Sequence, residues 1–189
     1  ESFSGLESFN RALADHILNH PTLEEDPGLN ATRNGLHTKE LLSEPLGPFA
    51  EFQQVLQRKA QAYLHEIPSD PSHPFTASKP SSFKLTIWAV VMNDGGHQIS
   101  HTHGDGYISG VYYVQIPDVV ARSGNGQEGW IEFGQPPKEF NCRVEPEVIT
   151  IQPEEGMVVL FPSYAYHRTI PFESDQQRIS IAFDFLTYG

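Results

Sequence analysis

The feature that most restricts the possible folds of this chain is a change of hydrophobic period near Phe83. From there onward, apolar residues alternate with polar ones or form short β-branched and aromatic runs, as is typical of strands. Gly, Pro, Asn or Asp bounds each run. The predicted strands are Leu85–Met92, Gln98–Thr102, Ser109–Gln115, Trp130–Phe133, Val148–Gln152, Met157–Phe161, Tyr166–Ile170 and Ile179–Leu186. Eight short strands with turns between them indicate a closed barrel or a double-sheet jelly roll.

The residues before Phe83 have a helical period instead. Apolar side chains recur every three or four positions in two segments, which predict amphipathic helices over Leu6–Leu18 and from Pro48 to Ile67. The segment Asp26–Asn34 is rich in Pro, Gly and Asn and is expected to be a loop.

The domain organisation follows from this division of the chain. We expect a single domain over residues 1–189, because no internal repeat and no second compositional region is visible. In this domain, residues 1–82 form a helical support, which ends in a Pro- and Ser-rich connection, and residues 83–189 form the jelly-roll core. The fold class is mainly β with flanking N-terminal helices.

Charge and cysteine content limit the partners and the compartment. The chain has 12 Lys and Arg against 24 Asp and Glu, a net charge of −12, so nucleic acid is not an expected ligand. Cys142 is the one cysteine, so no intrachain disulfide can form and a reducing cytoplasm is expected. The sequence has no apolar run long enough for a membrane span. It begins without Met, and both a longer parent chain and a homo-oligomer stay open.

Three histidines are the candidate metal ligands. His101 and His103 are two positions apart where a predicted strand ends, and in extended backbone side chains two apart project to one face. Neutral imidazole is the commonest protein metal ligand. A third ligand is needed, and His167 is the best candidate, although only the fold could bring it near the other two.

An arginine and a serine form a second candidate site. Arg178 and Ser180 lie two apart on an otherwise apolar strand, so they face the same way. A guanidinium in such a place is costly unless it meets an anion, and its planar fork suits a carboxylate. That anion is either a ligand or a protein carboxylate such as Asp184 or Glu173.

Together these residues resemble the 2-oxoglutarate/Fe(II) oxygenases, and more narrowly a bacterial and phage subfamily of them. The segments that carry the resemblance are Asn34–Thr38, His101-Thr102-His103, Ser109–Val114, Leu160–Ser163 and Arg178–Phe183. The resemblance therefore covers most of the chain. It implies a double-stranded β-helix of the jelly-roll, cupin-like type that uses Fe(II), 2-oxoglutarate and O2.

The resemblance also implies roles for individual residues. His101 matches the first metal histidine and His167 the distal one. Arg178 and Ser180 match the pair that holds the far carboxylate of 2-oxoglutarate, and Tyr113 matches a position whose hydroxyl helps to hold the cosubstrate.

One position departs from the usual pattern of two histidines and a carboxylate. If His101 is the first ligand, His103 stands where the carboxylate is expected. A shift of two residues restores the usual set as His103, Asp105 and His167. We favour His101, His103 and His167 as catalytic metal ligands, with Asp105 as the alternate ligand, because Gly104 and Gly106 suggest that Asp105 lies in a turn. A three-histidine set also resembles catalytic zinc sites.

The leading functional hypothesis is an Fe(II)- and 2-oxoglutarate-dependent oxygenase, a hydroxylase that couples decarboxylation of 2-oxoglutarate to oxidation of a substrate. A cupin-type metalloprotein, such as a three-histidine dioxygenase or an isomerase, would share the barrel and the metal without using 2-oxoglutarate. A non-catalytic jelly-roll binding module is the third hypothesis. The sequence does not name the substrate, which could be a small molecule or a protein.

Overall fold

One long strand, β3 (Phe83–His101), joins the two halves of the sheet in the computed structural model, which describes residues 3–25, 30–43, 45–122 and 126–187. The first half of β3 pairs with β9 (Arg178–Thr187), from Phe83 opposite Thr187 to Met92 opposite Arg178. Its last residues pair instead with β8 (His167–Thr169). The strand changes partner after a bend at Gly95, which has a φ of 72° that glycine adopts easily. The two strands predicted over this stretch are therefore one.

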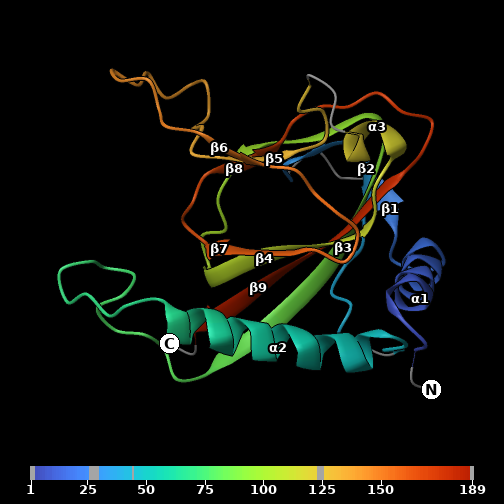
Figure 1. Ribbon diagram of the computed structural model, residues 1–189, viewed down its shortest axis with the longest axis horizontal. Helices are drawn as coiled ribbons and strands as arrows, with labels where there is room; N and C mark the ends of the chain where they lie inside the picture. Colours follow the sequence, from blue (N-terminus) through green and yellow to red (C-terminus); the bar gives the residue numbers. More distant parts are fainter. Residues whose placement is uncertain (1–2, 26–29, 44, 123–125, 188–189) are drawn as a thin grey trace.

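The described strands form one antiparallel path that folds over on itself. Its order is β6-β5-β8-β3-β9-β4-β7; off this path, β2 (Thr32–His37) pairs with β3, and β1 (Glu24–Glu25) pairs with β2. Figure 1 shows β6, β5 and β8 as one layer and β7, β4, β9 and most of β3 as the facing layer. The further strands are β4 (Gly106–Gln115), β5 (Ile131–Phe133), β6 (Ile149–Ile151) and β7 (Val158–Pro162), and a short helix, α3, covers Asp118–Ala121. The predicted jelly roll is confirmed.

Two helices pack on one side of this roll. α1 (Leu6–Leu18) has the predicted bounds, and α2 (Phe49–Glu66) lies within the predicted segment. Figure 1 shows α2 lying along the layer that contains β9 and β4. The buried faces of both helices join the sheet in one hydrophobic core, and the Tyr112 hydroxyl on β4 donates to Asn10 on α1 at 2.5 Å. The helices therefore support the face of the sheet that lies away from the candidate site.

The N-terminal part also contributes strands that the sequence analysis missed. β2 (Thr32–His37) pairs with β3, and β1 (Glu24–Glu25) pairs with β2. The predicted loop over Asp26–Asn34 is thus wrong for its last three residues, while residues 26–29 lie outside the described part. Asn34, with a φ of 52°, and Gly35 hid the alternation that marks a strand. Gly35 fits there because a Cβ would lie 2.9 Å from the Val91 carbonyl oxygen.

We expect Phe52→Ala to lower the free energy of unfolding by about 3–5 kcal/mol, the usual cost of removing a buried phenylalanine ring. The side chain is 1% exposed, and its ring centroid lies 4.9 Å from that of Tyr112. Denaturant titration with a far-UV circular dichroism signal would measure the change. Gln54→Ala, at an exposed position of the same helix, is the matched control and should change the free energy little. Equal effects of the two substitutions would contradict this packing of α2.

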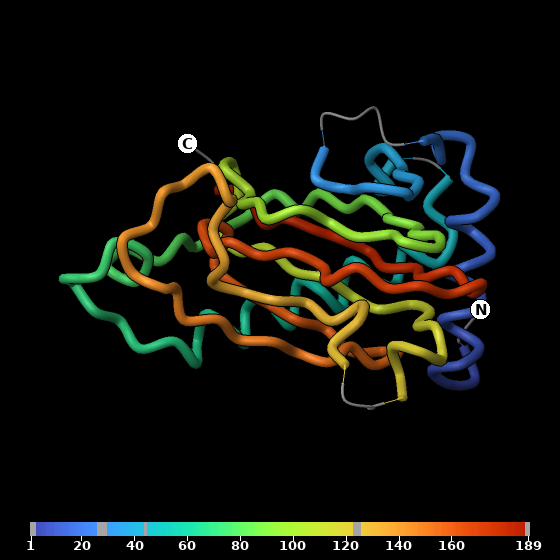
Figure 2. The backbone as a smooth tube through the Cα atoms, turned by 90° about the horizontal axis from the view of Figure 1, so that it is seen from above, coloured from blue at the N-terminus to red at the C-terminus, as the bar shows by residue number. Residues whose placement is uncertain are grey.

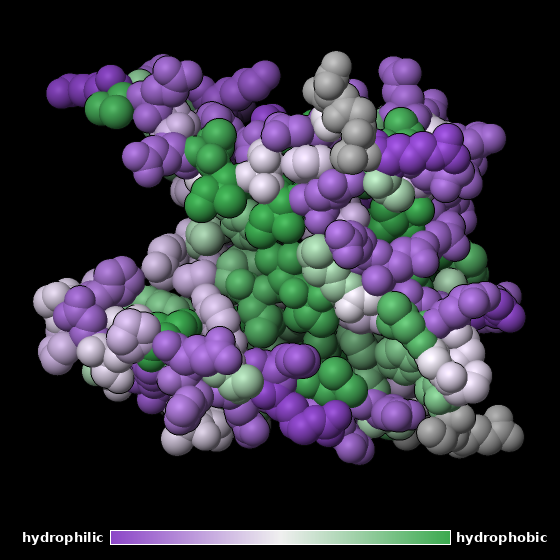
Figure 3. Space-filling model, viewed as in Figure 1, coloured by the Kyte–Doolittle hydropathy of each residue, from purple (hydrophilic) through white to green (hydrophobic). Residues whose placement is uncertain are grey.

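Two long connections project from the same end of the roll. One follows α2 and the other joins β5 to β6, and Figures 1 and 2 show both on the side opposite α1. Figure 3 shows a hollow between the two projections with hydrophobic residues at its floor. Among the helices described here, none is long and apolar enough to cross a membrane.

Candidate metal centre and adjoining cavity

The fold brings three histidines together at this end of the roll. His101 is the last residue of β3, and it lies opposite His167, the first residue of β8, in the register of these strands. His103 follows in a loop that is fixed by a hydrogen bond from its backbone N–H to the Ser163 carbonyl, 2.9 Å long. One ligand atom from each of the three rings can be chosen so that all lie within 4.8 Å of one another. Nitrogen ligands lie about 2.0–2.1 Å from zinc, for example, so two of them on one ion are at most about 4.2 Å apart. The three rings are close to this spacing, and a small inward movement would let them share one ion.

Hydrogen bonds at Nδ1 orient all three rings. His101 Nδ1 lies 2.8 Å from the Ile99 carbonyl oxygen, and His167 Nδ1 lies 3.1 Å from that of Ala165. A carbonyl oxygen only accepts, so both rings carry their proton on Nδ1 and present a lone pair at Nε2. His103 Nδ1 lies 2.6 Å from a carboxylate oxygen of Asp184, which only accepts, so this nitrogen also carries a proton. The Nε2 atoms of His101 and His103 lie 3.3 Å apart, close enough for both to bind one shared cation.

Burial keeps two of these rings neutral. Desolvation lowers the pKa of His167 to about 3, assisted by the nearby His101 ring. Desolvation also lowers the pKa of His101 to about 4. Since only neutral imidazole has a lone pair to give, both rings are ready to bind a metal ion at neutral pH.

Arg178 lies deeper in the same interior. Its side chain comes from the start of β9, is 2% exposed, and extends over the Tyr113 ring with 5.1 Å from guanidinium carbon to ring centroid. Its Nη1 lies 3.4 Å from the Ser180 hydroxyl. The Tyr113 hydroxyl and Arg178 Nε are buried without a hydrogen-bond partner. Burial raises the pKa of Tyr113 to about 12, so its hydroxyl keeps the proton that it can donate.

Neither of the protein carboxylates considered as partners for Arg178 reaches it. Asp184 stands six residues along β9, about 20 Å away at the rise of a strand, and pairs with His103. Glu173 is exposed. Among the described residues, no Asp or Glu forms an ion pair with Arg178. Its guanidinium is therefore a buried cation whose polar edge is available to an anion from outside the chain.

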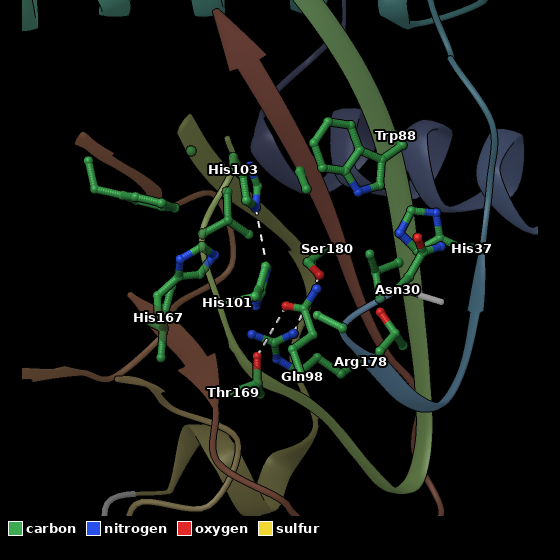
Figure 4. A pocket seen from close by; sticks show the side chains of 18 of the residues that line it. Asn30, His37, Trp88, Gln98, His101, His103, His167, Thr169, Arg178 and Ser180 are labelled. Carbon is green, nitrogen blue, oxygen red and sulfur yellow. Dashed lines mark hydrogen bonds between the residues drawn. The ribbon is translucent and has the colours of Figure 1, made fainter. Parts of the chain in front are cut away.

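A cavity of about 320 Å³ connects the histidines with Arg178. Figure 4 shows Arg178, Gln98 and Thr169 on one side of it and His103 and His167 on another. Gln98 accepts a hydrogen bond from the Thr169 hydroxyl at 3.4 Å. Among the described residues that line the cavity there is no Asp or Glu. The volume of the cavity is at the small end of the range for ligand sites, about 300–1,000 Å³. The cavity therefore suits a small anion that touches both the metal centre and the arginine.

The alternate ligand lies elsewhere. Asp105 is exposed in the turn after His103 and is not among the three residues of the cluster. A different carboxylate, Asp184, contacts this cluster through His103, although its sequence position suggested only a partner for Arg178. Gln98 and Thr169 were not predicted to line the cavity either, because the sequence does not indicate which cavity a polar side chain on a strand will line.

Comparison with known proteins agrees with this geometry. A family model described as "Putative 2OG-Fe(II) oxygenase" matches residues 86–184, about half of the chain, including the three histidines, Arg178 and Asp184. No curated protein matches the sequence.

Solved structures show the same fold at low sequence identity. A Pseudomonas putida prolyl-4-hydroxylase is 13% identical with a TM-score of 0.64, over 97% of this chain and 88% of that one. A Trichoplax adhaerens prolyl hydroxylase, in complex with a hypoxia-inducible-factor peptide fragment, is 14% identical with a TM-score of 0.63, over 95% and 78%. HygX from Streptomyces hygroscopicus, solved with nickel and 2-oxoglutarate bound, is 12% identical with a TM-score of 0.63, over 96% and 79%. At these identities the likeness shows the fold alone.

Proposed function

The chain belongs to the 2OG-Fe(II) oxygenase family, and from this premise we propose that His101, His103 and His167 hold Fe(II) while Arg178 anchors 2-oxoglutarate. The protein is a 2-oxoglutarate- and Fe(II)-dependent oxygenase. We further propose that it is a hydroxylase, which two of the structurally similar proteins are. Family membership favours this activity over a cupin-type metalloprotein that does not use 2-oxoglutarate and over a non-catalytic module.

The observation that carries the residue assignment is the unpaired arginine beside the histidine cluster. Arg178 is 2% exposed, lines the cavity, and has no carboxylate partner among the described residues. A buried charge without a counter-ion lowers the stability of the folded protein by roughly several kcal/mol, unless a ligand supplies the opposite charge. 2-Oxoglutarate has a carboxylate at each end, so it can meet the arginine with one end and the metal with the other.

The chain's own groups then have distinct tasks. The three histidine rings would hold the metal ion and leave it able to bind further ligands. Arg178 and the Ser180 hydroxyl donate to the far carboxylate, with the Tyr113 hydroxyl as a further donor. Fe(II), when bound, would supply the oxidising chemistry, in which one oxygen atom of O2 enters succinate as 2-oxoglutarate loses CO2 and the other oxygen atom enters the substrate. The buried walls around Tyr113 keep water from the cosubstrate.

Anaerobic titration tests the proposal. Fe(II) is added to the metal-free protein with 2-oxoglutarate, and we expect the weak visible charge-transfer band of Fe(II)-bound 2-oxoglutarate. Admission of O2 should then produce succinate. Glutarate has both carboxylates but no keto oxygen, so as a control it should give neither signal. Metal uptake with no band and no succinate would reject 2-oxoglutarate as the cosubstrate and favour the cupin-type alternative.

For compartment and partners we propose a cytoplasmic protein that binds neither nucleic acid nor membrane. The single exposed thiol of Cys142 and the net charge of −12 support this. The substrate is a small molecule or a protein segment that enters at the end of the roll where the two long connections project (Figure 3).

A further inference from the structure

One of the three histidines has a different outer partner from the other two. His101 and His167 donate their Nδ1 protons to backbone carbonyls, whereas His103 Nδ1 faces the carboxylate oxygen Oδ1 of Asp184 at 2.6 Å. This is the short distance of a charge-assisted hydrogen bond. His103 is also the residue that occupies the position where the usual ligand triad has its carboxylate.

The Asp184 carboxylate is held firmly in place. Ser109, directly opposite on β4, donates its hydroxyl to the same Oδ1 at 2.6 Å. Ser163 continues the network, with its Oγ 2.8 Å from that of Ser109. Ser109 and Ser163 are at most 1% exposed, and the Asp184 side chain is 13% exposed. The structure therefore builds a rigid acceptor site behind one metal ligand.

Asp184 has no cation of its own to balance it. Within the described part of the chain, it contacts the His103 ring, and no Lys or Arg forms an ion pair with it. A largely buried carboxylate is stable when it is hydrogen-bonded and when positive charge lies near. Behind a metal-bound imidazole, that charge would come from the metal through the ring.

A charge count shows what this carboxylate would correct. A dipositive ion, the 2-oxoglutarate dianion and the Arg178 guanidinium leave one positive charge in the interior when all metal ligands are neutral histidines. The usual triad cancels this charge with its own carboxylate ligand. In this protein, Asp184 can cancel the remaining positive charge from behind His103, without touching the metal.

We propose that Asp184 is a positioning residue that fixes the tautomer and orientation of His103 and supplies, through that ring, the negative charge that the three-histidine set lacks. The proposal rests on the proposed function, since it assumes a metal ion at the cluster. It predicts that the charge of residue 184 controls metal affinity although residue 184 does not touch the metal.

The test separates charge from hydrogen bonding. Asp184→Asn keeps an oxygen that can accept from His103 and Ser109 but removes the charge. We expect the Kd for Fe(II), measured by anaerobic titration of the metal-free protein, to rise about 10–100-fold, as when outer-shell partners of metal-bound histidines are removed. Glu132→Gln is the matched control, because it also replaces a buried carboxylate with an amide. The Glu132 carboxylate lies 2.6 Å from Arg168, so this substitution should leave the Kd for Fe(II) unchanged.

The outcomes distinguish this inference from the proposed function. If the unsubstituted protein takes up no Fe(II), the proposed function fails. If the unsubstituted protein and Asp184→Asn bind Fe(II) equally well, Asp184 does not supply the charge and the inference is overturned.

A measurement on the unsubstituted protein keeps the test valid even if the variant does not fold. Nitrogen-15 NMR of the histidine rings in the metal-free protein should show His103 as the Nδ1–H tautomer. Observation of the Nε2–H tautomer would overturn the role of Asp184.

Discussion

Arg178→Met is expected to weaken 2-oxoglutarate binding by about 100-fold or more, because truncation of one partner in a buried charge pair costs about 3 kcal/mol. Methionine fills a similar volume without the charge. The guanidinium has no carboxylate partner among the described residues, so its loss should leave the melting temperature of the ligand-free protein unchanged or higher. Isothermal titration with 2-oxoglutarate, in the presence of Mn(II) or Fe(II) without O2, measures the affinity, and differential scanning calorimetry measures the melting temperature.

The matched control is the same substitution at Arg168. This side chain already donates to Glu132 at 2.6 Å, and it does not line the cavity. Arg168→Met should therefore lower the melting temperature, because Glu132 loses its partner, and leave 2-oxoglutarate affinity unchanged. If Arg178→Met binds 2-oxoglutarate normally, the arginine is not the anchor and the cosubstrate lies elsewhere.

His167→Ala is expected to weaken metal binding by more than about 100-fold, which is the upper end of the effect of losing an outer-shell partner alone. The substitution removes one of three converging ligands. In the unsubstituted protein, Fe(II) should raise the melting temperature, because it binds the folded state, and this increase should be absent in the variant. Anaerobic metal titration and thermal unfolding with and without Fe(II) give the two measurements.

Two controls separate a ligand from a neighbour. His97→Ala changes a histidine of the same strand whose Nδ1 is bound to the Gly95 carbonyl and which is not in the cluster. Asp105→Asn changes the alternate ligand. Both variants should bind metal like the unsubstituted protein. A loss of affinity in Asp105→Asn with none in His101→Ala would instead establish His103, Asp105 and His167 as the ligands.

Local sequence patterns predicted most of the elements of the fold. The alternation after Phe83 and the helical spacing before it depend only on neighbouring residues, so they predicted both helices and the strands of the jelly roll. They failed at β2, where Asn34 and Gly35 interrupt the alternation. The position of β2 is set by its pairing with β3, whose partner residues lie more than 50 positions away in the sequence.

The candidate site divides in the same way. Residue type and spacing predicted His101 and His103 as metal ligands and Arg178 as an anion site, because paired imidazoles favour a metal ion and a guanidinium on an apolar strand needs a counter-charge. What each of these groups faces depends on how the strands pair. Strand register sets Arg178 opposite Met92 and Asp184 opposite Ser109, so the two charged groups lie six residues apart along one strand and cannot pair.

Residue types and their local spacing were enough to predict nitrogen ligands, one buried cation and a mainly β frame. The tertiary structure decided the partners, bringing His167 opposite His101 and placing Asp184 behind His103 across 81 positions of sequence. The physical reason is that a hydrogen bond needs its two atoms within about 3 Å. Such a distance between remote residues is set by how strands pair and fold over, and no local pattern records it.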